Sequence, residues 1–366
     1  MKKFNFPILT ICIVVGTVLF FYFKTGMNEN QKSNVDTQIS SAEKSDIFDK
    51  FSNATNSGEI SQKFAILFSS PFEENGEILI MNGDTQKNLS LKGTIGLGGV
   101  DQGNENELWL NGTESKSLYS IDIDNGKLVD QNAKDYTNYL IYENETKIIA
   151  YKDKNIDYSQ LEVEYKGNIV ISERIKGYLR VVKADENYVY AFADLVDDKE
   201  SSALYIYNLD TGELENTLPM KYKFANDIAF FQGKVLLTTK GKLTAFDPNN
   251  SELSYLDTKG EDFEANQILK INEEKVIITY SHLHFGTTVV ELDKDLKIIR
   301  EKNLNFPYAK AFLKNNSLYI ASAINNDKNV GIIGEFNVKD YHKTGQIVIP
   351  KVGELPIAGA EILNGK

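Results

Sequence analysis

Residues 204–214 read LYIYNLDTGEL, and this stretch decides the class of fold. The run Leu204–Asn208 is apolar and aromatic, which favours a β-strand. Asp210, Thr211 and Gly212 follow, and such residues accept the backbone angles of a tight turn. The stretch therefore predicts a β-hairpin, and residues 118–128, LYSIDIDNGKL, predict a second one of the same form.

A similar apolar run recurs along the chain and indicates an internal repeat. The copies, of which the third is the weakest, are residues 78–82, 118–122, 161–165, 204–208, 243–247, 289–293 and 333–337. Their ends are spaced by about 42 residues, and propeller blades repeat every 40–50 residues or so. A second strand-like run precedes each copy, at residues 64–68, 107–110, 147–151, 188–192, 235–239, 276–280 and 318–321. Because no long helical periodicity follows residue 62, helical repeats are excluded.

The hairpin motif, a strand followed by Asp-x-x-Thr-Gly-Lys/Glu and a second strand, resembles that of seven-bladed β-propellers of the YVTN/quinoprotein-like (WD40-like) superfamily. Residues 204–214 and 118–128 carry the resemblance, which extends over residues 62–366. It implies an all-β propeller of four-stranded blades and specifies no activity.

The two ends of the repeat region predict how the ring closes. Residues 358–366, AGAEILNGK, resemble residues 226–234, NDIAFFQGK, which open an internal blade. The strand that should follow is missing at the C-terminus and present at residues 63–67. We therefore expect the C-terminal strand to complete the blade formed by residues 62–95, which removes an exposed sheet edge.

The first residues of the chain predict where in the cell the protein is located. An apolar run from Phe4 to Phe23 follows Lys2 and Lys3, and about 20 apolar residues span a bilayer as a helix. No small-x-small cleavage pattern ends the run, so residues 1–24 are interpreted as an uncleaved signal anchor with a cytoplasmic N-terminus. A cleaved signal peptide and a lipoprotein modified at Cys12 stay open as alternatives.

Residues 25–61 are polar and predict a flexible stalk, within which Ile47, Phe48 and Phe51 favour a short helical turn. The expected organisation is thus an anchor over residues 1–24, a stalk over 25–61 and a propeller over 62–366. This describes a single-pass protein of the cell membrane that contacts the bilayer only through its N-terminal helix, with a monomeric propeller on the extracytoplasmic side.

Composition narrows the classes of partner. The 52 acidic residues exceed the 40 basic residues, for a formal net charge of -12. Such a field repels phosphate backbones, so nucleic acid is excluded as a partner. The chain has 1 Cys and therefore cannot form an internal disulfide.

Polar side chains near the starts of the expected inner strands are the candidate ligand-binding residues, because propellers usually meet ligands where inner strands begin around the central channel. The candidates are Asn138, Arg180, Asn226, Asp227, Asn266, Gln267, Lys310 and Glu361. Their alternative role is to bond loop backbones and one another. In particular, Arg180 and Lys310 are expected either to pair with Asp227 and Glu361 or to bind an anionic ligand.

No cofactor or metal is predicted, although two metal alternatives stay open. Asp, Glu and Asn oxygens are calcium ligands, and a set of them resembles the sites of calcium-dependent lactonase propellers. His282 and His284 lie on one face of an extended segment and could hold zinc. Residues 122–126, DIDNG, resemble part of a calcium loop but are interpreted as a hairpin turn.

These observations favour a binding or scaffold module for a protein, a peptide or a cell-envelope polymer. The alternative is an extracytoplasmic hydrolase or lactonase with a divalent metal at the channel mouth. No Gly-x-Ser-x-Gly elbow occurs, and Cys12 lies in the expected anchor, so a catalytic nucleophile is not identified.

Overall fold

In five repeats, the turn forms around the Asp or Asn that ends the apolar run, namely Asp122, Asn208, Asp247, Asp293 and Asn337. Asn208 Oδ1 accepts hydrogen bonds from the backbone N–H groups of Asp210 and Thr211, both at 3.0 Å. Gly212 follows with φ of +74°, a left-handed conformation that favours glycine. Asp122 makes the same pair of bonds at the equivalent turn, at 2.9 Å. The side-chain oxygen closes each of these turns, which explains why these repeats end on Asp or Asn.

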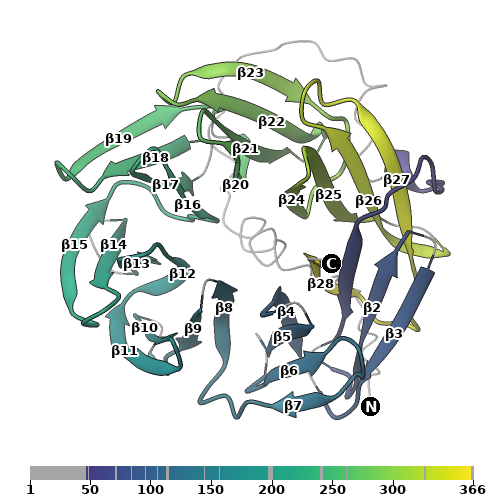
Figure 1. Cartoon of the computed structure of the whole chain (residues 1–366), viewed down its shortest axis with the longest axis horizontal. Coiled ribbons are helices and arrows are strands. Elements are labelled where there is room, and N and C mark those ends of the chain that lie inside the picture. Colours follow the sequence, from purple (N-terminus) through teal and green to yellow (C-terminus); the bar gives the residue numbers. More distant parts are fainter. Residues whose placement is uncertain are drawn as a thin grey trace, which may run out of the picture.

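The computed structural model places the repeats in a ring (Figure 1). It describes residues 47–363 except 48, 71, 84, 95, 105, 113, 114, 144, 156, 197–200, 240, 241, 261, 283, 325 and 326. The described residues form seven antiparallel sheets of four strands each. The chain is therefore a seven-bladed β-propeller, as the sequence predicts.

Each blade runs from an inner strand beside the axis of the ring to an outer strand at its circumference (Figure 1). The inner strands are β4 (Leu97–Gln102), β8 (Thr137–Glu143), β12 (Tyr178–Ala184), β16 (Ile228–Phe231), β20 (Glu264–Asn272), β24 (Lys310–Lys314) and β28 (Ile357–Ile362). The second strands are β1 (Lys63–Phe68), β5 (Glu107–Gly112), β9 (Thr146–Lys152), β13 (Tyr188–Asp194), β17 (Lys234–Thr239), β21 (Lys275–His282) and β25 (Ser317–Ala323).

The two remaining strands of each blade lie farther from the axis. The third strands are β2 (Gly76–Asn82), β6 (Leu118–Asp122), β10 (Tyr158–Tyr165), β14 (Ser202–Asn208), β18 (Lys242–Asp247), β22 (Gly286–Asp293) and β26 (Asn329–Asn337). The outer strands are β3 (Thr85–Leu91), β7 (Leu128–Asp130), β11 (Asn168–Lys176), β15 (Leu214–Met220), β19 (Glu252–Asp257), β23 (Ile298–Asn303) and β27 (Lys343–Pro350).

Closure of the ring follows the predicted exchange between the two ends of the chain. The first sheet has the order β28-β1-β2-β3, so a C-terminal inner strand completes an N-terminal blade. Phe64 pairs with Ile362 and Ile66 with Ala360 in an antiparallel register. The expectation of terminal closure is therefore confirmed.

The hydrophobic core lies between neighbouring blades. The second strands are almost wholly buried, as in β1 and β17, whereas the outer strand β19 is mainly exposed. One such core joins side chains of β9 and β10 to those of β12 and β13, including Ile148, Leu161, Val182 and Val189. Because both faces of a blade pack against neighbours, each blade depends on the next for its stability.

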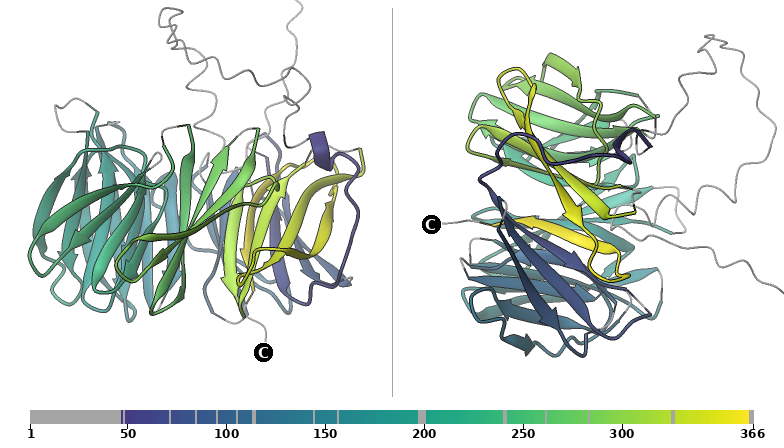
Figure 2. Two further views of the ribbon diagram at one scale, coloured as in Figure 1. Left: turned by 90° about the horizontal axis from the view of Figure 1, so that it is seen from above. Right: turned by 90° about the vertical axis from the view of Figure 1, so that its right-hand side faces the viewer.

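The last part of the expected stalk packs on the propeller instead of standing clear of it. The short helix η1 (Asp49–Phe51) lies beside β27 in both views (Figure 2). Ile47 is 1% exposed, and the ring of Phe51 meets that of Phe306 edge to face at 5.0 Å. Ser57 forms a backbone bridge with Gln346. Phe51 and Ala54 pack against one hydrophobic core of the propeller and Ile60 belongs to another, so a few apolar residues suffice to fix this segment.

The expected anchor and the first part of the stalk, residues 1–46, lie outside the described residues. In the described part of the chain, no helix combines the length and apolar character needed to cross a bilayer.

Candidate functional site

Side chains from all seven blades meet at the axis of the ring. Most inner strands carry a β-bulge near their start, for example between Thr137 and Tyr139 and between Leu179 and Val181. A bulge changes which way the following side chains point. We call the resulting set the axial cluster: Asp101 (β4), Tyr139 (β8), Lys183 (β12), Asp227 (just before β16), Gln267 (β20), Tyr308 (just before β24), Lys310 (β24) and Glu361 (β28).

The first ion pair of the axial cluster joins Lys183 to Asp227. Lys183 Nζ lies 2.8 Å from Asp227 Oδ1. Asp227 is 7% exposed, and its Oδ2 accepts the backbone N–H of Ile268 at 2.8 Å. Burial acts to lower the pKa of Lys183, but the carboxylates around it, Asp227 first, raise it above its ordinary value. Lys183 is therefore a protonated partner of a well-bonded carboxylate.

The second ion pair joins Lys310 to Glu361. Lys310 Nζ lies 2.7 Å from Glu361 Oε2 and donates to the backbone oxygen of Ala360 at 3.0 Å. Burial again acts to lower the pKa of the lysine, while Glu361 and Asp101 raise it above its ordinary value. Glu361 belongs to β28, so this pair also ties the closing strand to its neighbour β24.

Asp101 is the carboxyl group of the axial cluster with an unusual pKa. Burial and the nearby Glu361 raise its pKa from 3.8 to about 7, against the opposing effect of Lys310. Its Oδ2 accepts the backbone N–H of Tyr142 at 3.2 Å. Asp101 therefore changes charge near neutral pH, which makes it the group best suited to proton transfer or to a pH-dependent contact.

Two tyrosines and a glutamine complete the axial cluster. Burial, with smaller contributions from Asp227 and Asp101, raises the pKa of Tyr139 well above its ordinary value, so its hydroxyl is neutral. Tyr308 donates its hydroxyl to Gln267 Oε1 at 2.8 Å, and the same oxygen accepts the backbone N–H of Ala311 at 2.5 Å. These bonds hold Gln267 in place.

Four of the residues proposed from the sequence, Asp227, Gln267, Lys310 and Glu361, lie in the axial cluster. Arg180 instead pairs with Asp194, Nε to Oδ2 at 2.6 Å, and not with Asp227 or Glu361 across the ring. The side-chain N–H groups of Asn226 and Asn266 are used by the backbone oxygens of Ala265 and Glu264, at 2.8 and 3.0 Å. The side chain of Asn138 lies outside the described residues.

The sequence reasoning missed Asp101, Tyr139, Lys183 and Tyr308. Asp101 and Lys183 each lie two residues beyond the point where the bulge ends, and alternate strand residues share a face. The period of two along the inner strands could therefore have found Asp101 and Lys183, but only if the bulges had been known.

Neither metal alternative gains support from the geometry. The rings of His282 and His284 lie 5.8 Å apart, and His282 stacks on Phe285 at 4.6 Å. Within the described ranges, no three His, Cys, Asp or Glu side chains are grouped to hold a metal ion.

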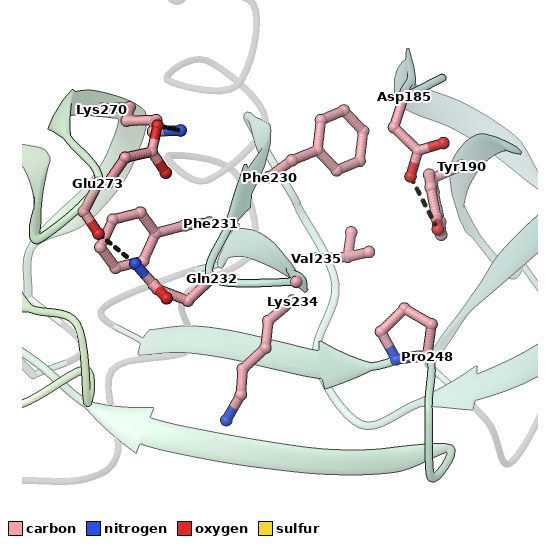
Figure 3. A pocket seen from close by; sticks show the side chains of 11 residues that line it. Asp185, Tyr190, Phe230, Phe231, Gln232, Lys234, Val235, Pro248, Lys270 and Glu273 are labelled. Carbon is pink, nitrogen blue, oxygen red and sulfur yellow. Dashed lines mark hydrogen bonds and ion pairs between the residues drawn. The ribbon is translucent and has the colours of Figure 1, made fainter. Parts of the chain in front are cut away.

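A cavity of about 450 Å³ lies where β13, β16, β17 and β20 meet, and it shares no residue with the axial cluster (Figure 3). Tyr190 donates its hydroxyl to Asp185 at 3.2 Å, and Lys270 pairs with Glu273 at 2.6 Å. Another cavity, of about 550 Å³, lies between β11 and the hairpin of β14 and β15. The polar groups of the first cavity are mostly bonded to one another. The axial cluster also contains Asp101, which has no ion-pair partner among the described residues, so the axial cluster is the better candidate site.

In sequence, the chain is similar to an uncharacterized bacterial protein over part of its length. No protein-family model matches the chain. The uncharacterized protein YeeG of Bacillus subtilis (strain 168) is 23% identical over 214 residues, which cover 55% of this chain and 60% of that protein. The match thus spans less than two thirds of the curated relative.

Several solved structures have a similar fold. A protein from Lactobacillus plantarum matches with a TM-score of 0.59 and 12% identity, over 83% of this chain and 100% of that one. A Bacteroides fragilis protein named as a candidate 6-phosphogluconolactonase gives 0.58 and 13%, over 83% and 98%. The dihydro-heme d1 dehydrogenase NirN gives 0.55 and 11%, over 83% and 75%. These likenesses confirm the predicted propeller resemblance, and at such identities they show the fold alone.

Proposed function

We propose that the protein is a membrane-anchored binding module on the extracytoplasmic side. Its propeller binds a protein, a peptide or a cell-envelope polymer at the axial cluster. The anchor is the apolar run from Phe4 to Phe23, with the N-terminus in the cytoplasm. The propeller acts as a monomeric ring.

The observation that carries the proposal is that each lysine of the axial cluster forms an ion pair with a carboxylate. Lys183 and Lys310 have raised pKa values and stay protonated at neutral pH, so neither amine is available as a nucleophile or base. Asp227 is held by Lys183 and by backbone N–H groups. A set of paired charges on a rigid scaffold suits recognition of a partner better than bond cleavage.

The test combines topology with binding. Protease added to intact protoplasts should digest the propeller and leave a membrane-protected fragment that contains the N-terminus. The full-length protein, immobilised from detergent, should then retain purified cell-wall fragments or peptides without converting them, as followed by mass spectrometry. A propeller protected inside the cell, or product formation from the retained material, would contradict the proposal.

The alternative function is hydrolysis of a lactone or ester, and one observation favours it. Asp101, with a pKa of about 7, has the strength of a general base that activates water at neutral pH. Because a protein of similar fold is named as a candidate 6-phosphogluconolactonase, lactones are the substrates to test first. A panel of lactones, assayed with and without added calcium, decides between the two functions, since turnover that Asp101→Asn abolishes would establish the hydrolase.

A further inference from the structure

The axial cluster contains three carboxyl groups and two lysines, and Glu143 at the end of β8 is a further carboxylate that acts on Lys183. Asp227 pairs with Lys183, and Glu361 pairs with Lys310. Across the described ranges of the chain, no lysine or arginine lies within ion-pair distance of Asp101. Its carboxyl group accepts hydrogen bonds from the backbone N–H groups of Tyr142 and Gln102. The cluster is therefore short of one positive charge whenever Asp101 is ionised.

Titratable groups on four other inner strands interact with Asp101. Glu361 on β28 repels its charge and Lys310 on β24 attracts it, while Lys183 on β12 and Tyr139 on β8 also interact with it. Burial and Glu361 raise the pKa of Asp101 to about 7. The raised pKa values of Lys183, Lys310 and Tyr139 keep those groups protonated at neutral pH. Among these four groups, Asp101 is the one that gains or loses a proton near pH 7.

We propose that the axial cluster binds its ligand through a protonated amine, which takes the place of the missing cation beside Asp101. This inference rests on the proposed function, because it assumes that the ligand binds at the axial cluster. An ammonium group has three donors and no acceptor, and it matches a site that offers the carboxylates of Asp101 and Glu361. The amine can come from a small molecule or from a lysine side chain of a peptide.

The same geometry disfavours other ligand chemistries. An anionic ligand would have to displace Asp227 or Glu361 from lysines that they contact at 2.8 and 2.7 Å. A divalent metal needs several grouped ligands, and the described residues offer no such group of three.

Binding of an amine is coupled to the charge of Asp101. Below pH 7 the carboxyl carries a proton, which must leave to solvent before the carboxylate accepts the ammonium group. Apart from this loss of a proton, no covalent bond forms or breaks. Affinity should therefore rise about tenfold between pH 6 and pH 8, as expected for loss of one proton with a pKa near 7. An amine with a pKa near 10 stays charged over this range.

The test uses the full-length protein in detergent micelles and isothermal titration calorimetry. The probes are n-butylamine, a tetra-lysine peptide, and the same peptide with all its amines acetylated. Titrations at pH 7 in phosphate and in HEPES, which differ in ionisation enthalpy and contain no primary amine, measure the protons released. We expect n-butylamine or tetra-lysine to bind with proton release, and the acetylated peptide to fail. Binding of n-butylamine indicates a small amine, and binding of tetra-lysine alone indicates a peptide.

Two variants separate the axial site from general attraction to an acidic protein. Asp101→Asn should weaken binding at least tenfold and abolish proton release. Asp210→Asn removes one exposed carboxylate from the β14–β15 turn and should bind as wild type does. If Asp101→Asn does not fold, Glu361→Gln serves instead, because it frees Lys310 to pair with Asp101 and should also weaken binding.

Equal affinity in Asp101→Asn and wild type, or equal binding of the acetylated peptide, would overturn the inference. So would absence of binding by both amine probes at millimolar concentration. In each case, retention of an uncharged or anionic cell-wall fragment would leave the proposed binding function standing. Conversely, amine conversion observed by mass spectrometry would overturn the binding function and keep the amine assignment.

Discussion

Asp101 makes the stability of the protein depend on pH in a direction opposite to that of an ordinary surface carboxylate. Its pKa is about 7 in the folded chain and near 3.8 when unfolded. Between these values the folded state holds the extra proton, so the free energy of unfolding falls as pH rises from about 4 to 7. Above pH 7 the loss is complete and amounts to a few kcal/mol at most.

We therefore expect Asp101→Asn, which mimics the protonated carboxyl, to melt at a higher temperature than wild type at pH 8 and at nearly the same temperature at pH 4. Thermal melts followed by circular dichroism at the two pH values measure the difference. Asp153→Asn is the matched control: Arg174 lowers the pKa of Asp153 to about 2, so removal of this carboxylate should not raise stability at pH 8. An Asp101→Asn variant less stable than wild type at pH 8 would contradict the raised pKa.

Arg180 is expected to stabilise the fold without taking part in binding. Its guanidinium pairs with the buried Asp194 and lies over the ring of Phe224 at 5.0 Å. Arg180→Ala leaves a buried carboxylate without its cation and should cost about 2 kcal/mol. Lys294→Ala, which breaks an exposed pair with Glu274 at 3.5 Å, should cost less than about 1 kcal/mol. Urea denaturation of both variants tests this order, and equal losses would place Arg180 in an equally exposed setting.

At the scale of residues, the sequence predicted which types of side chain meet at the axis but only part of their identity. Asp227, Gln267, Lys310 and Glu361 were predicted and lie there. Arg180 follows Leu179 within a bulge, and a shift of one residue turns a side chain to the other face. A repeat alignment has no information on bulges, so it could not tell which of two successive residues faces the axis.

At the scale of elements, the closing strand β28 should determine whether the ring stays intact. It completes the first blade through its ladder with β1 and contributes Glu361 to the pair with Lys310. A chain ending at Glu354 loses this strand and exposes the apolar edge of β1. We expect its melting temperature to fall well below that of wild type, whereas a chain ending at Leu363 should melt as wild type does. Equal melting of the two chains would contradict closure by β28.

The segment before β1 should also contribute to stability. Ile47 and Ile60 are each 1% exposed, and Phe51 packs on Phe306. A chain starting at residue 62 loses these contacts, whereas one starting at residue 46 keeps them. We expect the shorter chain to lose several kcal/mol in urea denaturation, since burial of one large apolar side chain contributes about 1.5–3 kcal/mol. Identical midpoints would mean that the segment is only loosely attached.

The elements themselves were largely predictable. The ends of the seven repeated runs, from Asn82 to Asn337, coincide with the ends of the third strands. These strand ends could be predicted from the sequence because Asp, Asn and Gly have a local role in the turns that follow. The packing of residues 49–61 could not be predicted from the sequence, because it depends on a surface formed by residues more than 200 positions away in the sequence.

At the scale of the whole molecule, the repeat spacing predicted the number of blades, and the likeness between two segments predicted closure. The sequence could not predict which charged side chains form ion pairs at the axis. Lys310 and Glu361 are 51 residues apart, and their contact at 2.7 Å depends on the radius of the ring. Such contacts become known only once all seven blades are in place.

A closed ring of mutually dependent blades should unfold as one unit, and the only tryptophan provides the test. Trp109 lies on β5 of one blade, is 7% exposed, and stacks on Tyr142 of the next blade with ring centroids 6.3 Å apart. Its fluorescence therefore reports a single interface between blades, whereas far-ultraviolet circular dichroism reports all the strands. Because no blade has both faces buried without its neighbours, we expect the two signals to give the same midpoint in urea. In a chain ending at Glu354, the blades nearest the lost strand should open first, so the tryptophan signal should change before the circular dichroism signal. Separate midpoints in the intact protein would contradict a single cooperative ring and indicate that groups of blades unfold independently.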